Sequence, residues 1–303
     1  MDLSSLQVFV TVARERSFSR AAEKLYRTQP AVSISVRKLE EWVGQPLFVR
    51  GTGAGKLTEA GMLLTEYAER MLNLREEARR SLEDLAGLRR GRLSLGVNES
   101  SIHALLPALG RFRRKHPKVE IAFHRGYSRD IPREILNYRL DLGVASYRPA
   151  DKALAAIEFL RDDLAFVVHP RHRLAKMRRI SIADLGNEVF VAHIVSSPYR
   201  ERVIQLFAHH HVQLQMGVEL PTIESIKRFV EMGMGVAIVP RMCVQTEVAR
   251  GQLTEVRIRE MHLRRDLFLI FRRDRPLSHP ARAFVRLLLP KQSADFAGKR
   301  MTN

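Results

Sequence analysis

The chain has 303 residues, 45% of them hydrophobic, which is enough for more than one packed domain. Its net charge is +18 and its pI is about 10.8, a balance that favours a polyanionic partner such as nucleic acid. No run of about 18 apolar residues and no signal peptide occurs, so we expect a cytoplasmic protein without a membrane partner. The lone Cys243 excludes an intrachain disulfide and a cysteine-based metal cluster.

The first predicted elements are two short helices joined by a tight turn, at residues 19–25 and 28–40. Ser19 is a candidate N-cap for the first helix. The second helix can begin at Thr28, since Pro30 is tolerated in a first turn. Three apolar residues recur at helical spacing and should face the core, and these are Val32, Val36 and Leu39.

Another face of the second helix carries groups that can bond to DNA. Gln29, Ser33 and Arg37 lie four residues apart, and their donors and acceptors suit base edges and phosphates. This pattern predicts a helix-turn-helix whose second helix enters a major groove. An ordinary helical hairpin with a solvated polar face is the alternative interpretation.

The segment 44–61 is typical of a hairpin wing. A short strand at 47–49 precedes a glycine-rich tip, and Arg50 and Lys56 flank that tip, where they can hold DNA phosphates. Thr58 then caps a new helix. The predicted DNA-contacting residues are Arg20, Thr28, Gln29, Pro30, Ser33, Ser35, Arg37, Lys38, Arg50 and Lys56.

Residues 59–88 contain no proline and predict one long helix. Apolar side chains recur in it at alternating steps of three and four residues, and these are Leu64, Tyr67, Met71, Leu74 and Ala78. A stripe of this kind over about three heptads predicts a coiled coil between two copies of the chain. A surface helix packed on its own chain is the alternative.

These segments together resemble a LysR-type transcriptional regulator. The words that carry the resemblance are SFSRAAEKL, TQPAVS, VRKLE, GQPLFVR and LTEAG, with RLSLGV, LDLGVAS and GMGVAIVP farther along. The resemblance implies a multidomain α/β protein: a winged helix-turn-helix at 1–58, a coiled-coil linker helix at 59–88, and a two-lobed, periplasmic-binding-protein-like effector domain at 91–303. It places lobe 1 at about 91–161 and 268–290 and lobe 2 at about 162–267, and it implies dimers that pair into a homotetramer.

The second half of the chain alternates strands with helices. The predicted strands are 92–98, 119–125, 140–146, 156–169, 188–192, 214–219, 235–239 and 267–272, and the predicted helices are 101–115, 130–138, 198–209, 222–232, 241–250 and 279–289. Such alternation predicts parallel sheets with helices on both faces.

Hydroxyl groups gather where predicted strands end and helices begin, the edge at which such sheets bind ligands. With neighbouring histidines they form the candidate effector site: Asn98, Ser100, Ser101, His103, Ser146, His193, Ser196, Ser197 and Thr222. Each serine or threonine could equally be only an N-cap. Free helix N-termini favour a small organic anion as effector. We expect no cofactor and no metal, because adjacent histidines at 209–211 point in different directions from a helix.

We therefore expect a sequence-specific, effector-responsive DNA-binding transcriptional regulator and not an enzyme, since no catalytic motif occurs in the sequence. The expected partners are double-stranded promoter DNA, a second copy of the chain, a small-molecule effector and RNA polymerase. One rival interpretation is a solute-binding or catalytic α/β domain with an accessory DNA-binding module. Another is an architectural protein that binds DNA without sequence preference.

Overall fold

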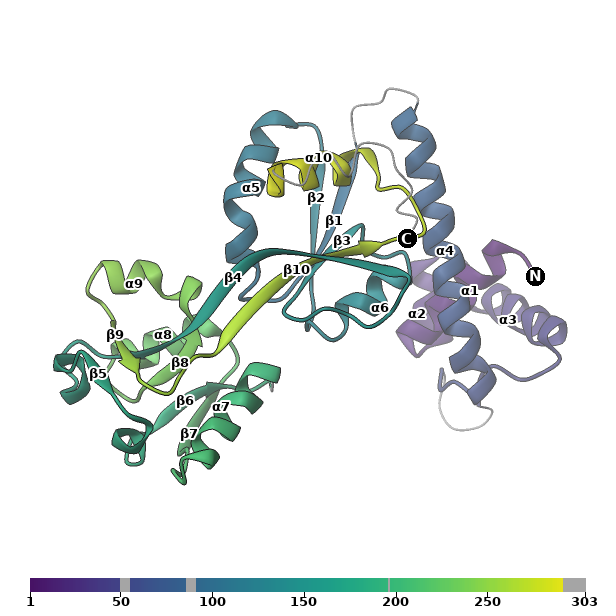
Figure 1. The fold of residues 1–303 in the computed structure, drawn as a ribbon. Coiled ribbons are helices and arrows are strands. Elements are labelled where there is room, and N and C mark those ends of the chain that lie inside the picture. Colours follow the sequence, from purple (N-terminus) through teal and green to yellow (C-terminus); the bar gives the residue numbers. More distant parts are fainter. Residues whose placement is uncertain (50–54, 86–90, 196, 291–303) are drawn as a thin grey trace. The chain divides into compact units, whose positions relative to one another are not determined.

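The computed structural model describes residues 1–49, 55–85, 91–195 and 197–290 (Figure 1). Arg50 and Ser196 lie outside the described residues, as does the tip of the predicted wing. The chain divides into two compact units: an N-terminal unit of residues 1–92 with 136–139, and a C-terminal unit of residues 93–135 with 140–303.

The N-terminal unit is helical and contains both helices predicted near the start of the chain. Its helices are α1 (Leu3–Glu15), α2 (Phe18–Lys24), α3 (Gln29–Val43) and α4 (Glu59–Leu85). The expected N-cap of α2 was wrong, because the helix begins at Phe18 and its N-cap lies two residues before the predicted Ser19. Ser17 has extended backbone angles, and its side chain accepts a hydrogen bond from the Arg20 amide at 3.3 Å.

Helix α3 presents its predicted apolar face to the core, since Val32, Val36 and Leu39 are at most 3% exposed. The core also holds an aromatic cluster, in which the ring of Phe48 meets Phe9 and Phe18 edge to face at centroid distances of 5.5 and 5.3 Å. The core of this unit therefore includes aromatic rings from α1, from α2 and from the segment that follows α3.

The described part of the segment after α3 forms a short antiparallel pairing. The Val49 amide donates to the Lys56 carbonyl at 2.8 Å, and the Thr58 amide donates to the Leu47 carbonyl at 3.0 Å. Gly55 has a φ of +96°, and a Cβ there would lie 2.5 Å from the backbone of Arg16. A glycine is therefore required at this position for both conformation and space.

Helix α4 is a single helix of 27 residues, as its sequence predicts, and its predicted cap is present. The Thr58 hydroxyl accepts a hydrogen bond from the Gly61 amide at 3.0 Å. Ala68 and Leu72 are buried in the same hydrophobic cluster as α1, α2 and α3, so one face of α4 packs on its own chain.

The C-terminal unit alternates strands and helices. Its strands are β1 (Arg92–Val97), β2 (Glu120–Arg125), β3 (Leu142–Ala145), β4 (Leu154–Val168), β5 (Arg179–Ile180), β6 (Phe190–His193), β7 (Met216–Leu220), β8 (Ala237–Pro240), β9 (Thr254–Ile258) and β10 (Arg264–Arg272). Its α-helices are α5 (Ile102–Lys115), α6 (Ile131–Leu136), α7 (Pro198–His209), α8 (Ile223–Glu231), α9 (Gln245–Ala249) and α10 (His279–Leu288). The sequence did not reveal β5 or β9, and the helix expected at 241–250 is a 3₁₀ turn (Arg241–Cys243) followed by α9.

The main sheet is mixed, so the prediction of parallel sheets was wrong for it, although the pairs β1–β3, β5–β9 and β6–β7 are parallel. The main sheet has the order β2-β1-β3-β10-β4-β9-β5, with β8 also beside β4, while β6 and β7 form a separate parallel pair. Strand β10 runs antiparallel to both β3 and β4, and β4 runs antiparallel to β8 and β9. The alternation of strands and helices does not encode this, because β4 and β10 carry the chain out to the second lobe and back and must run in opposite directions.

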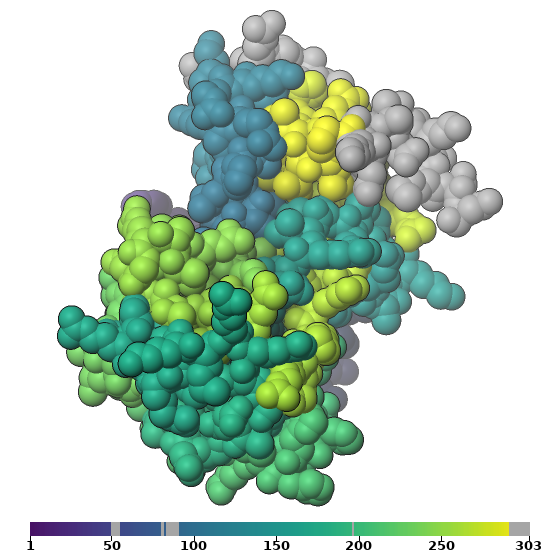
Figure 2. All heavy atoms as spheres, turned by 60° about the vertical axis from the view of Figure 1, so that its left-hand side comes forward, coloured from purple at the N-terminus to yellow at the C-terminus, as the bar shows by residue number. Residues whose placement is uncertain are grey.

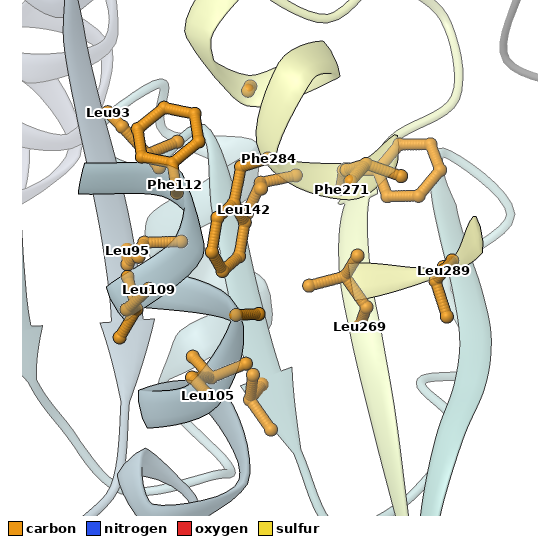
Figure 3. Close-up of a cluster of buried hydrophobic side chains, with 14 of the residues drawn as sticks. Leu93, Leu95, Leu105, Leu109, Phe112, Leu142, Leu269, Phe271, Phe284 and Leu289 are labelled. Carbon is orange, nitrogen blue, oxygen red and sulfur yellow. The ribbon is translucent and has the colours of Figure 1, made fainter. Parts of the chain in front are cut away.

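The strands of the C-terminal unit serve two lobes. Lobe 1 is built around β1, β3, β10 and the first part of β4, with α5 and α10 side by side on it (Figure 1, Figure 2). Phe112 and Phe284 meet edge to face in its core, with ring centroids 5.5 Å apart (Figure 3). Lobe 2 begins where β4 exchanges its partner, since Asp163 pairs with β10 and Leu164 pairs with β8.

Candidate functional site

The predicted DNA-facing side chains lie on the surface of α2, α3 and the wing. Gln29 is exposed, and its side-chain amide donates to the Ser33 hydroxyl at 2.9 Å. This bond holds the amide along the helix face, where its other polar groups stay free for a partner. Ser33 and Ser35 are half-buried, and the remaining exposed candidates are Arg20, Thr28, Pro30, Arg37, Lys38 and Lys56.

An anchor between α3 and the wing was not foreseen from the sequence. The Glu40 carboxylate accepts hydrogen bonds from the Leu47 amide at 2.7 Å and the Phe48 amide at 3.3 Å. It thereby ties the backbone at Leu47 and Phe48 to the last turn of α3. An acidic residue on a basic surface carries no motif of its own, and only its position after folding gives it this role.

Helix α4 leaves part of its apolar surface exposed. Tyr67, Met71 and Leu74 from the predicted stripe are 50%, 39% and 47% exposed, and Leu63 beside them is 60% exposed. Leu64, also in the predicted stripe, packs instead against the hydrophobic core that α1, α2 and α3 form in its own chain. The exposed apolar stripe of α4 therefore passes through Leu63 at its first turns.

The C-terminal unit holds a cavity of about 630 Å³ between its two lobes. The predicted effector residues that line this cavity are Asn98, Ser100, Ser146, His193 and Ser197. Apolar side chains of lobe 2 form much of its wall, among them Phe190, Val203, Leu214 and Ile238. A cavity of this size, largely apolar with a few converging polar groups, suits a small ligand.

Asn98 organises the polar end of the cavity. Its side-chain oxygen accepts from the Ser100 hydroxyl at 3.1 Å and from the Ser101 amide at 2.8 Å. Its side-chain amide donates to the Ser128 hydroxyl at 2.7 Å, and Ser146 reaches the same hydroxyl at 3.4 Å. The loops after β1, β2 and β3 are thus linked through side chains that the cavity exposes.

Three predicted effector residues do not line the cavity. Ser101 is fully buried and its hydroxyl forms hydrogen bonds with the backbone of Asn98, so it stabilises the loop after β1. His103 is exposed on α5. Thr222 caps α8, its hydroxyl accepting from the Ser225 amide at 3.0 Å. For Ser101 and Thr222 the capping or loop-holding role is the one that the contacts describe.

A buried arginine at the junction of the lobes was missed by the sequence analysis. Arg265 on β10 is 3% exposed, faces Asp162 on β4 across the strand pair with 3.4 Å between nitrogen and oxygen, and donates to the Ser100 hydroxyl. Burial raises the pKa of the Asp162 carboxyl, although Arg265 opposes the shift. The Arg265 guanidinium also lies 5.9 Å from the ring centre of Tyr199 in lobe 2.

Tyr199 makes a second link between the lobes. Its hydroxyl donates to the Ser146 carbonyl oxygen at 2.5 Å, and burial raises the pKa of its phenol. The neighbouring Arg200 lines the cavity, donates to the His193 carbonyl at 2.7 Å and forms an ion pair with Glu219. The cavity wall carries an excess of positive charge, since its arginines are Arg125, Arg129, Arg200 and Arg265 and its acidic residue is Glu99.

Three findings bear on other classes of protein. Within the described residues, no group of three or more His, Cys, Asp or Glu side chains is placed to hold a metal ion. None of the described helices is both long and apolar enough to cross a membrane. Burial raises the pKa of Cys243 to about 12, so this thiol stays protonated and unreactive at neutral pH.

Two family models match the chain and together span most of it. Residues 3–62 match the bacterial regulatory helix-turn-helix protein model of the lysR family, and residues 86–293 match the LysR substrate binding domain. The chain belongs to the LysR family of transcriptional regulators. This LysR-family protein is 34% identical over 296 residues to a probable RuBisCO transcriptional regulator of Trichormus variabilis, covering 95% of this chain and 88% of the relative. A protein of the same name from Synechocystis is 33% identical over 298 residues, covering 96% and 86%.

Solved structures agree with this assignment. The LysR-family regulator CbnR aligns with a TM-score of 0.72 and 21% identity over 96% of this chain and 99% of that chain, and a structure of full-length CbnR complexed with its target DNA aligns with a TM-score of 0.71 and 22% identity over the same shares. The regulatory domain of Synechocystis PCC6803 CcmR in complex with 2-PG aligns with a TM-score of 0.59 and 27% identity, covering 68% of this chain and 98% of that domain. The protein is thus a DNA-binding transcriptional regulator with an effector-binding domain.

Proposed function

We propose that the cavity between the lobes binds a small organic anion, a carboxylate or a phosphorylated carboxylate, and that this anion controls promoter binding. The observation that carries the proposal is the positive excess of the cavity wall, with the buried Arg265 beside the Ser100 hydroxyl at its polar end. Arginine donors of this kind pair strongly with carboxylate and phosphate oxygens. The binding of 2-PG by CcmR supports the same ligand class.

Calorimetry on the full chain tests this proposal, with 2-phosphoglycolate as the first probe and a panel of small carboxylates after it. Ser100→Ala removes a hydroxyl from the cavity and should weaken anion binding, while His103→Ala, an exposed residue outside the cavity, should leave it unchanged. An effector that proves cationic, or equal affinity in both variants, contradicts the proposal.

In the same proposal, Gln29 and Ser33 contact base edges, and the basic side chains of α2, α3 and the wing hold phosphates. The exposed apolar stripe of α4 joins two subunits, and two dimers form a homotetramer that acts on promoter DNA and RNA polymerase in the cytoplasm. The exposed Tyr67, Met71 and Leu74 support the pairing. Footprinting on DNA upstream of the gene, of its neighbours and of RuBisCO genes identifies the target, and equal protection of random DNA contradicts sequence-specific binding.

A further inference from the structure

Glu99 is the acidic side chain in the cavity wall, and it occupies a position suited to an anion. It follows β1 in lobe 1, and its Oε1 accepts a hydrogen bond at 2.8 Å from the amide of Ile223, the first residue of α8 in lobe 2. A free amide at a helix N-terminus is a preferred site for a negative charge. This amide is satisfied by the chain's own carboxylate.

The second oxygen of Glu99 lies near an arginine and a histidine of the cavity wall. Its Oε2 is 3.5 Å from the Arg125 guanidinium and 3.5 Å from Nε2 of His193. This oxygen is buried and accepts no hydrogen bond from the described residues. Both distances are longer than a strong charge-assisted hydrogen bond. The groups around Oε2 therefore form a site suited to an anion, and Glu99 fills this site incompletely.

The contacts of Glu99 join the two lobes. Arg125 ends β2 in lobe 1, whereas His193 ends β6 and Ile223 begins α8 in lobe 2. A carboxylate that holds partners on both sides favours one arrangement of the lobes. Its release removes that preference, and a ligand that prefers the released arrangement shifts the population toward it.

We propose that Glu99 is an internal substitute for the effector's anionic group, and that an anionic effector acts by displacing it from Ile223, His193 and Arg125. The inference rests on the proposed function, because it takes the effector to be an anion bound in this cavity. The effector must then compete with a tethered carboxylate. Its apparent affinity is its intrinsic affinity multiplied by the fraction of molecules in which Glu99 has left the position. Glu99 therefore sets the concentration at which the regulator responds.

Glu99→Gln in the full chain tests the proposal, since it removes the charge and keeps an oxygen that can accept from the Ile223 amide. Calorimetry with 2-phosphoglycolate and with inorganic phosphate should give binding about tenfold tighter than in the wild type, as expected if the position is vacant in about a tenth of molecules. Glu219→Gln is the matched control. Glu219 pairs with the cavity residue Arg200 but is outside the cavity wall, so this variant should bind the probes within about twofold of the wild type.

The Glu99 variants and a cationic probe, ethanolamine, distinguish failure of this proposal from failure of the proposed function. Thermal unfolding confirms that each variant is folded, and Glu99→Ser, which shortens the side chain, should also bind the anions more tightly. If the wild type binds an anion and Glu99→Gln binds it equally or more weakly, the internal substitute is wrong and the proposed function stands. If no protein binds an anion, or if ethanolamine binds the wild type and not Glu99→Gln, both proposals are wrong.

Discussion

The two units build their candidate sites in different ways. In the N-terminal unit, the candidate DNA-facing groups lie on α2, on α3 and on the segment that follows α3, within one short stretch of chain. In the C-terminal unit, the cavity wall draws on residues from Asn98 to Arg265, which meet only after two lobes have folded. The first site is local in the sequence, and the second is a product of tertiary structure.

The two sites also differ in how far their charged groups are buried. The DNA-facing candidates are mostly exposed, and Arg37 pairs with Glu41 across one helical turn at 3.7 Å. The cavity instead contains a buried guanidinium, paired with a buried carboxylate from another strand. Exposed charges contribute little to stability, whereas a broken buried pair leaves a desolvated charge behind. Substitutions of these site residues should therefore affect binding alone in the first unit, and both binding and folding in the second.

The largest expected effects come from truncating one core aromatic in each unit. Phe48→Ala and Phe284→Ala each remove a buried ring that meets another ring edge to face, and each should cost about 3–5 kcal/mol of unfolding free energy. Trp42 on α3 is the single tryptophan, so its fluorescence follows the N-terminal unit while circular dichroism follows the whole chain. Phe48→Ala should shift the transition that Trp42 fluorescence reports. Phe284→Ala should shift only the transition that is seen by circular dichroism and not by fluorescence. A shift of both transitions by either variant would contradict independent unfolding of the two units.

Arg265→Gln tests the buried pair at the junction of the lobes. It leaves the Asp162 carboxylate without its partner, so the C-terminal unit should lose about 3 kcal/mol or more, and anion binding should fall with it. Urea denaturation followed by circular dichroism measures the first effect. Arg264→Gln, an exposed neighbour on the same strand, is the control and should change the stability little. Equal stability of the two variants would show that Arg265 has no special role.

The contrast between the units also explains what the sequence could predict. Val32, Val36 and Leu39 repeat with the helical period and the turn is short, so the helix-turn-helix follows from neighbouring residues. Arg265 has no such local signal, since it stands in the run Arg264-Arg265 and only the pairing of β10 with β4 buries one of the two. The direction of the strands was missed for the same reason, because periodicity does not record which strand returns beside which.

Leu74→Asp tests the exposed apolar stripe of α4. A carboxylate there would be buried without a partner between two helices, so the dimer should dissociate and DNA affinity should fall while the winged helix stays folded. Light scattering gives the mass, and Trp42 fluorescence monitors the fold. Arg75→Ala, at an exposed neighbouring position, should keep the wild-type mass. A wild-type mass for Leu74→Asp would remove this stripe from the subunit contact.

Gln29→Ala tests base reading by the recognition helix. Loss of the side-chain amide should cost about 1–3 kcal/mol on the cognate site and relax the preference at one base pair. Lys56→Ala is the comparison. It removes the proposed phosphate contact of Lys56, so it should weaken binding to all DNA sequences alike and lower the salt slope by about one. Fluorescence anisotropy with cognate and random duplexes measures both. An unchanged ratio of the two affinities in Gln29→Ala contradicts base reading.

The smallest effect concerns pH, and here the two units should respond with opposite signs. Burial raises the pKa of Asp162 above its ordinary 3.8, so the folded C-terminal unit binds that proton more tightly than the unfolded chain does. The contribution of Asp162 to the stability of the folded state is complete below the unfolded pKa and is lost as the pH rises through the folded value.

In the N-terminal unit, the hydrogen bond from Lys24 lowers the pKa of Glu15. The contribution of Glu15 to stability is therefore present above the unfolded pKa and is lost as the pH falls through the folded value. We therefore expect the two substitutions to change the dependence of unfolding free energy on pH, between about pH 3 and 6, in opposite directions. Asp162→Asn removes a contribution that falls as the pH rises, which circular dichroism measures. Glu15→Gln removes a contribution that increases as the pH rises, which Trp42 fluorescence measures. Slopes that change in the same direction in both variants would contradict the burial of Asp162 as the source of its shift.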